Sequence, residues 1–258
     1  KGYELSLNWR DEFQLLRRPF SYSVTLTFND YVSNITKFDN PDRSFAKKYY
    51  EGMRWGEIWG YRIDGLFASD EEARNYPVDQ TTVNEIINAS AGAEKGLRAG
   101  DLKFRDVTGD GKITEADRTM IGNPTPDFTY GYSVNLQYKN FDLGIDFQGV
   151  YGNELFNTSF LSAYAQYNYH TKRLGRWNGE GTSNWEPILD SSRATQMMNS
   201  SYFIEDGSYL RLKNIQLGYS FGDRILKKIR LKALRVFMNI DNLATWSHNT
   251  GYTPEIGG

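Results

Sequence analysis

One acidic, glycine-containing segment carries residue types and spacing that suit a metal ion: DVTGDGKITEAD, residues 106–117. Oxygen-bearing side chains recur at the ligand positions of a twelve-residue calcium loop, and Gly111 at its sixth position permits the sharp turn. We therefore expect a structural Ca²⁺ ion that braces this loop. The expected ligands, with Lys112 contributing its carbonyl, are Asp106, Thr108, Asp110, Lys112, Thr114 and Asp117.

Two positions depart from the strongest calcium loops. Thr108 stands where Asp or Asn would bind better, and Asp117 is shorter than the bidentate Glu that usually closes such a loop. We expect only modest affinity, and a metal-free Asp/Gly turn is the alternative interpretation.

The chain that follows this loop alternates apolar and polar residues. In residues 141–151 the odd positions are mainly apolar and the even ones mainly polar, and residues 128–138 alternate in the opposite phase. Successive side chains of a strand point to opposite faces, so each segment predicts a strand between an apolar and a polar phase. The short link Lys139-Asn140 predicts a hairpin.

The same alternation predicts four more strands, at residues 3–9, 21–29, 214–221 and 234–240. Phe237 interrupts the last pattern, and Leu210 with Leu212 interrupts the one before it. Such interruptions indicate a β-bulge or a filled lumen.

The predicted connections alternate between short and long. Residues 10–19, 139–140 and 222–230 form short links, whereas residues 39–127 and 152–206 form long ones. Outer-membrane barrels have short periplasmic turns and long extracellular loops, whereas a soluble sandwich has no reason to place every long loop at one end. The pattern predicts an all-β, transmembrane antiparallel barrel segment.

Composition narrows the function classes. The chain is 15% aromatic, as expected for girdles that flank a lipid-facing band, and its net charge of -2 gives no support for nucleic-acid binding. It has no Cys, which excludes disulfides and thiolate metal sites. His170 and His248 lie in no nucleophile or metal motif, so we expect no enzyme.

Five motifs together resemble the C-terminal part of SusC/RagA-type TonB-dependent outer-membrane transporters of Bacteroidota. They occur in the order found in that family, and the resemblance covers nearly all of the chain. The motifs lie at residues 60–73, 106–136, 138–157, 206–221 and 234–255.

This resemblance implies that residues 1–258 supply about six strands of a 22-stranded plugged barrel in the bacterial outer membrane. The plug and the N-terminal regions, including the segment that contacts TonB, would lie outside this chain, and a SusD-like surface lipoprotein would close the extracellular mouth. The implied function is TonB-dependent import of an oligosaccharide or oligopeptide. The alternative is a secreted, calcium-braced β-protein such as a glycan-binding module or adhesin.

Aromatic residues gather in both long loops. They either form the cores of folded loops, stack on sugars or pack against the lipoprotein lid, and we expect loop cores. These residues are Trp55, Trp59, Tyr164, Tyr167, Tyr169, His170, Trp177 and Trp185.

Overall fold

The structure is a computed structural model that describes residues 1–43, 48–80, 97–157, 171–189, 199–251 and 253. The chain divides into two compact units, which we describe separately. The sheet unit comprises Lys1–Trp55, Thr125–Glu154 and Asp206–Glu255, and the loop unit comprises Gly56–Pro124 and Leu155–Glu205.

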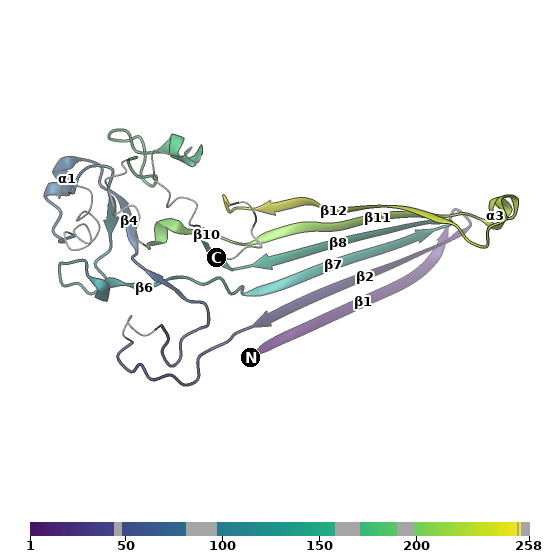
Figure 1. Cartoon of the computed structure of the whole chain (residues 1–258), viewed down its shortest axis with the longest axis horizontal. Coiled ribbons are helices and arrows are strands. Elements are labelled where there is room, and N and C mark those ends of the chain that lie inside the picture. Colours follow the sequence, from purple (N-terminus) through teal and green to yellow (C-terminus); the bar gives the residue numbers. More distant parts are fainter. Residues whose placement is uncertain (44–47, 81–96, 158–170, 190–198, 252, 254–258) are drawn as a thin grey trace. The chain divides into compact units, whose positions relative to one another are not determined.

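The sheet unit is built on six long strands in the order β1-β2-β7-β8-β11-β12, and every neighbouring pair is antiparallel (Figure 1). The six strands predicted from the alternation are confirmed. Their bounds are β1 Gly2–Leu15, β2 Arg18–Tyr31, β7 Phe128–Tyr138, β8 Phe141–Tyr151, β11 Tyr209–Ser220 and β12 Arg235–Ser247.

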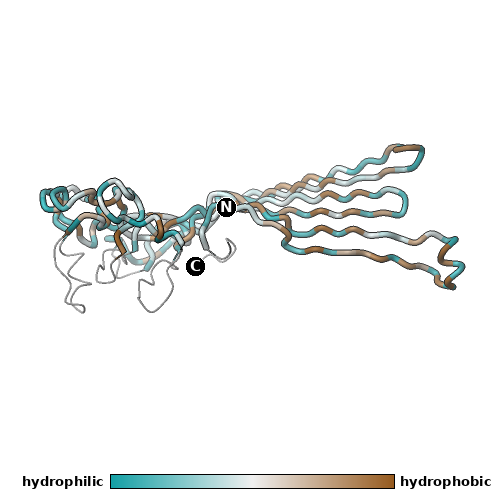
Figure 2. Tube along the Cα trace, turned by 90° about the horizontal axis from the view of Figure 1, so that it is seen from above, coloured by the Kyte–Doolittle hydropathy of each residue, from teal (hydrophilic) through white to brown (hydrophobic). Residues whose placement is uncertain are grey.

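The strand register gives this sheet one apolar and one polar face. Figure 2 shows apolar and polar residues alternating along the strands. Paired residues carry the same character from strand to strand, which is what a sheet between lipid and a polar interior requires. One apolar row runs Trp9, Val24, Val134, Ile145, Ile215 and Ile240, and the next polar row runs Arg10, Ser23, Asn135, Gly144, Gln216 and Asn239.

One predicted connection is wrong in detail. The link expected at residues 10–19 is a two-residue turn, in which Leu16 and Arg17 both have positive φ, so β1 and β2 are longer than predicted. The alternation stops at Asp11 because this acidic residue occupies the apolar face opposite Tyr22. The link at residues 222–230 contains a short helix, α3 (Asp223–Ile229).

The interruption near Leu212 is a β-bulge, which is one of the two interpretations that the sequence left open. The pairing of β11 with both of its neighbours shifts between Leu212 and Asn214, so Leu212 and Ile215 lie on the same face. Phe237 pairs with Gly218, which places its ring on the polar face beside a residue without a side chain.

Among its described residues, the loop unit has short strand pairs and a buried hydrophobic core. The pairs are β3 (Ile58–Gly60) with β6 (Thr119–Gly122), β4 (Ile63–Leu66) with β5 (Leu102–Phe104), and β9 (Glu154–Phe156) with β10 (Ile204–Asp206). A short helix, α1 (Asp70–Arg74), follows β4. The core residues are Tyr61, Ile63, Leu66, Leu102, Phe104, Ile113, Tyr202 and Phe203. No helix within the described ranges is long and apolar enough to cross a membrane.

Candidate functional site

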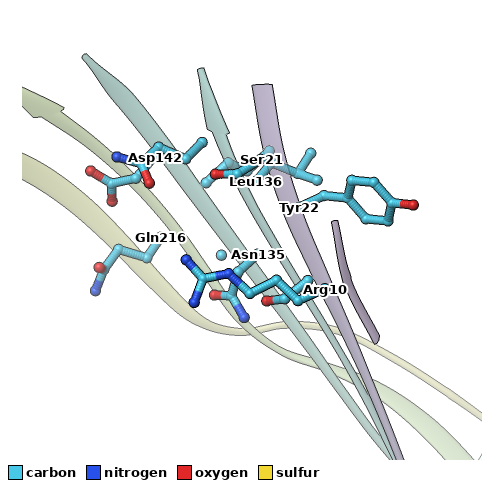
Figure 3. Close-up of a pocket in the computed structure, with 11 residues that line it drawn as sticks. Arg10, Ser21, Tyr22, Asn135, Leu136, Asp142 and Gln216 are labelled. Carbon is cyan, nitrogen blue, oxygen red and sulfur yellow. The ribbon is translucent and has the colours of Figure 1, made fainter. Parts of the chain in front are cut away.

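The polar face of the sheet contains a cavity of about 300 Å³ (Figure 3). Arg10, Asn135 and Gln216 share one row of the register across this cavity, and Gly144 between them leaves its floor open. Figure 3 shows the Tyr22 ring pointing away from the other labelled side chains. The cavity therefore presents hydrogen-bonding groups from five strands to the interior side of the sheet.

An ion pair holds one side of this polar face. The Arg235 guanidinium donates to Asp142 through Nε at 3.2 Å and through Nη2 at 2.5 Å, and Nη2 also donates to Gln216 Oε1 at 2.9 Å. This bidentate contact orients Asp142 and Gln216 beside the cavity. The sequence gives no sign of the pair, because its two residues lie 93 positions apart, on β8 and β12, and only the register brings them together.

Two aromatic rows bracket an aliphatic band on the opposite face. Near the short turns, Phe13, Phe20, Tyr138, Phe141 and Tyr219 pair in register; near the long loops lie Phe28, Phe128, Tyr130, Tyr151 and Trp246. Eight residue steps from Phe20 to Phe28, at roughly 3.3 Å each, span roughly 26 Å along β2. That span matches the apolar band of an outer-membrane barrel, about 25 Å tall, between two aromatic girdles.

The predicted metal loop folds around Asp117 in the loop unit. Asp117 is fully buried, and its Oδ1 accepts the Val107 and Thr108 N–H groups at 3.0 and 3.1 Å and the Thr108 hydroxyl at 3.0 Å. Its Oδ2 accepts the Thr114 N–H group at 2.7 Å and the Thr114 hydroxyl at 3.3 Å. Both ends of the loop are thus tied to one carboxylate.

Hydrogen bonds, rather than charge neutralisation, keep Asp117 ionised. Burial by itself raises the pKa of a carboxyl, but the hydrogen bonds from Thr114, Thr108 and Val107 outweigh it and hold the pKa of Asp117 below the ordinary value. This local network therefore depends on the charged form.

The other predicted ligands are less enclosed. Asp106 accepts the N–H groups of Gly109 and Gly111 at 2.6 and 2.8 Å, and Asp110 accepts that of Lys112 at 2.9 Å. In the part of the chain that the structure describes, no three His, Cys, Asp or Glu side chains are grouped closely enough to hold a metal ion. The calcium assignment remains a prediction.

The predicted loop aromatics divide between partly buried and exposed positions. Trp177 packs against the core of the loop unit, as expected for a loop core, whereas Trp55 and Trp185 are exposed. Trp59 donates its indole N–H to Glu57. Tyr164, Tyr167, Tyr169 and His170 lie outside the described residues.

A buried polar network that the sequence did not predict lies beside Trp177. Arg173 Nη1 donates to Glu186 Oε1 at 2.6 Å, and the Tyr202 hydroxyl donates to Glu186 Oε2 at 2.8 Å. Burial raises the pKa of Tyr202 far above its ordinary value, so this hydroxyl keeps its proton as a donor. The network joins residues 173, 186 and 202 of the second long loop, which is a structural role.

Sequence comparison finds relatives over the whole chain, although no family model matches. The chain is 31% identical to TonB-dependent receptor P3 of Formosa agariphila over 270 residues, which is 99% of this chain and 25% of the relative. It is 31% identical to TonB-dependent receptor SusC of Bacteroides thetaiotaomicron over 155 residues, which is 59% of this chain and 15% of the relative. The chain spans about a quarter of the length of the curated relatives that it matches throughout.

Structure comparison gives the same fold. The structure of the RagAB peptide importer in the 'open-open' state matches all of this chain and 26% of that chain, with a TM-score of 0.66 and 18% identity. A second structure, of the RagAB peptide transporter, matches with a TM-score of 0.66 and 19% identity. These structures confirm the barrel fold predicted from the alternating strands.

Proposed function

By sequence and by fold this chain corresponds to part of the barrel of a SusC/RagA-type TonB-dependent outer-membrane transporter, and we propose that it contributes to active import of a large nutrient. The observation that carries the proposal is the two-faced sheet. Its apolar face meets lipid, while its polar face, with Arg10, Asn135 and Gln216 around an open cavity, lines the interior through which substrate passes.

We propose an oligosaccharide or an oligopeptide as the substrate. The polar face offers hydroxyl, amide and guanidinium groups, which bind either class through hydrogen bonds. The RagAB relatives are a peptide importer, and this supports the peptide class without deciding between the two. Energy coupling through TonB would use regions outside this chain.

We propose a SusD-like lipoprotein as the partner that closes the extracellular mouth. Both long connections leave the sheet from the same ends of β2 and β8, so residues 39–127 and 152–206 are the segments that we expect to contact it. A complex whose partner touched only the short turns at Leu16-Arg17 and Lys139-Asn140 would contradict this.

A growth experiment tests import. The gene for the complete transporter is deleted, and growth is compared on a panel of polysaccharides, on peptone, and on the corresponding monomers. We expect a defect on one oligomeric nutrient and none on its monomer. Equal growth of both strains on every nutrient would contradict import. Release of the protein from membranes without detergent would instead support a secreted glycan-binding module or adhesin.

We also propose that the loop at residues 106–117 binds Ca²⁺ with modest affinity. Asp106, Asp110 and the Lys112 carbonyl supply oxygens of the type that calcium prefers. Asp117 fits less well, because it is fully buried and would have to exchange several of the hydrogen bonds that its two oxygens accept. Calorimetric titration of the purified transporter with Ca²⁺, repeated for Asp106→Ala, tests this: heat that is unchanged by the substitution would place the ion elsewhere.

A further inference from the structure

The helix α3 (Asp223–Ile229) lies at the short-turn end of the sheet, where β1 turns into β2 and β7 into β8 (Figure 1). Just before the helix, the Phe221 ring contacts Tyr219 edge-on, with 5.0 Å between the ring centroids, and Tyr219 belongs to the aromatic row near the short turns. Phe221 therefore continues this row. Because such girdles lie at the boundary between lipid and water, α3 begins at the level of the lipid headgroups.

The helix α3 has one apolar and one basic side. At about 100° per residue, Ile225, Leu226 and Ile229 fall on one side of the helix. The opposite side is basic and carries Arg224, Lys227 and Lys228. Leu226 is buried, whereas Ile225 and Ile229 are 43% and 46% exposed, so only part of the apolar side is covered within the described residues. A helix divided in this way suits the interface plane of a membrane.

Cations gather at this end of the sheet. They are Arg17, Arg18, Lys139, Arg224, Lys227, Lys228, Arg230 and Lys232, and all eight are exposed. The three short turns that hold them, residues 16–18, 139–140 and 222–234, contain one carboxylate, Asp223, in a chain whose net charge is -2. Lys139 Nζ lies 5.0 Å from the centroid of the Tyr138 ring, so the positive charges border the aromatic row directly.

We propose that α3 lies in the membrane interface and that the cations of the three turns bind the phosphate groups of anionic phospholipids, such as phosphatidylglycerol. The short turns of an outer-membrane barrel face the periplasm, and the leaflet on that side consists of phospholipids. Arginine and lysine pair with phosphate through charge-assisted hydrogen bonds. Ile225 and Ile229 enter the boundary between the headgroups and the acyl chains.

The apolar side of α3 distinguishes lipid from an acidic protein, which would suit the charges equally well. Ile225 and Ile229 follow Phe221 closely in the chain, so they continue the surface that the sheet presents to the membrane. Lipid therefore accounts for both sides of the helix at once. The inference uses the membrane placement of the sheet and does not depend on which nutrient is imported.

Native mass spectrometry of the complete, delipidated transporter tests the proposal. Phosphatidylglycerol and phosphatidylethanolamine with identical acyl chains are titrated against the wild type and against Lys227→Gln/Lys228→Gln. The matched control is Lys37→Gln/Lys48→Gln, which removes two exposed lysines that follow the opposite end of β2. We expect the first variant to bind phosphatidylglycerol about 30-fold more weakly than the wild type, a change of about 2 kcal/mol, and the control to bind like the wild type.

Two further variants separate the contribution of charge from that of apolar contact. Lys227→Arg/Lys228→Arg keeps both charges and should bind like the wild type. Ile225→Ser/Ile229→Ser should weaken both lipids alike, because it removes apolar contact without changing charge. A wild type that binds both lipids equally would overturn the proposal. So would a Lys227→Gln/Lys228→Gln variant that keeps the preference for phosphatidylglycerol, a result that would assign these cations to an acidic protein partner instead.

Discussion

Replacing Asp117 with Asn tests whether the loop at residues 106–117 is stabilised by hydrogen bonds to this carboxylate or by a bound metal ion. The Asp117 carboxylate accepts three backbone N–H groups, from Val107, Thr108 and Thr114. An asparagine keeps one acceptor oxygen and turns an NH₂ group toward at least one of these N–H donors. A buried donor without an acceptor costs about 1–3 kcal/mol, and loss of the charge weakens the remaining bonds. We expect a loss of about 2–4 kcal/mol in the local stability of the loop.

Hydrogen exchange of the complete transporter measures this loss. Amides of residues 107, 108 and 114 should exchange faster by roughly 30-fold or more, since each 1.4 kcal/mol corresponds to a factor of ten. The matched control is Glu115→Gln, because the Glu115 side chain is exposed and its 3.5 Å ion pair with Arg118 should contribute little. Exchange that is unchanged in Asp117→Asn would refute the assignment of Asp117 as the residue that closes the loop.

The same hydrogen-exchange measurement, repeated with and without Ca²⁺, tests whether the loop binds the ion. At a free concentration 100 times its Kd, an ion that binds only the folded loop stabilises it by about 2.7 kcal/mol. We expect Ca²⁺ to slow exchange in the wild type and a chelator to reverse the effect. If a chelator changes nothing while Asp117→Asn accelerates exchange, the metal-free turn is correct.

Three further predictions concern the strands, the buried network and acid. Ile145→Arg, on the apolar face, should destabilise the barrel by about 2–4 kcal/mol if Ile145 lies near the bilayer midplane, whereas Gly144→Arg on the polar face should destabilise it less. Equal denaturation midpoints for the two variants would contradict the assignment of the apolar face to lipid. Arg173→Met should cost about 3–5 kcal/mol because it leaves Glu186 buried without its cation, and adding Glu186→Gln should restore part of that loss in thermal unfolding. Because folding lowers the pKa of Asp117, the stabilisation that this carboxylate provides is complete above about pH 4 and is lost as the pH falls further. Hydrogen exchange at the Thr114 amide, corrected for its intrinsic pH dependence, should therefore accelerate in acid. A corrected exchange rate that rises above neutral pH instead would contradict this.

The strands could be predicted from the sequence because each face of a barrel meets one environment. Alternation alone therefore placed Val134 and Ile145 on one face and Asn135 and Gly144 on the other, and the register agrees. The prediction fails where a polar residue occupies the apolar face. Asp11 lies on the apolar face one row from the aromatic girdle, close to the short turns, so the alternation ends there and the last third of β1 was not predicted.

Turn chemistry explains a second failure. Leu16 and Arg17 both adopt positive φ without the glycine or asparagine that usually signals a two-residue hairpin. The pairing of Phe13 with Phe20 on either side holds this turn closed, so tertiary contacts override local preference. No pattern within residues 10–19 indicates that outcome.

The core of the loop unit lay beyond prediction for a different reason. Its contacts join segments far apart in the chain, as when Tyr61 N–H donates to the Asn199 carbonyl and Ser201 N–H donates to the Tyr61 carbonyl. Short strands such as β3 and β4 have too few residues to show a period, and their neighbours supply the stability. Composition revealed aromatic loops but not which rings meet.

The calcium loop shows how far spacing can determine a site. Spacing brings Asp106, Asp110 and Asp117 into one turn, but it does not decide whether a carboxylate faces an ion or the backbone. Burial decides this for Asp117: a fully buried charge needs donors at once, and the N–H groups of residues 107, 108 and 114 provide them within the chain. Asp106 and Asp110 are more open to water, so they retain the freedom to bind a cation. A metal that binds here should therefore depend on Asp106 and Asp110 for affinity, while Asp117 governs the stability of the loop whether or not the metal is bound.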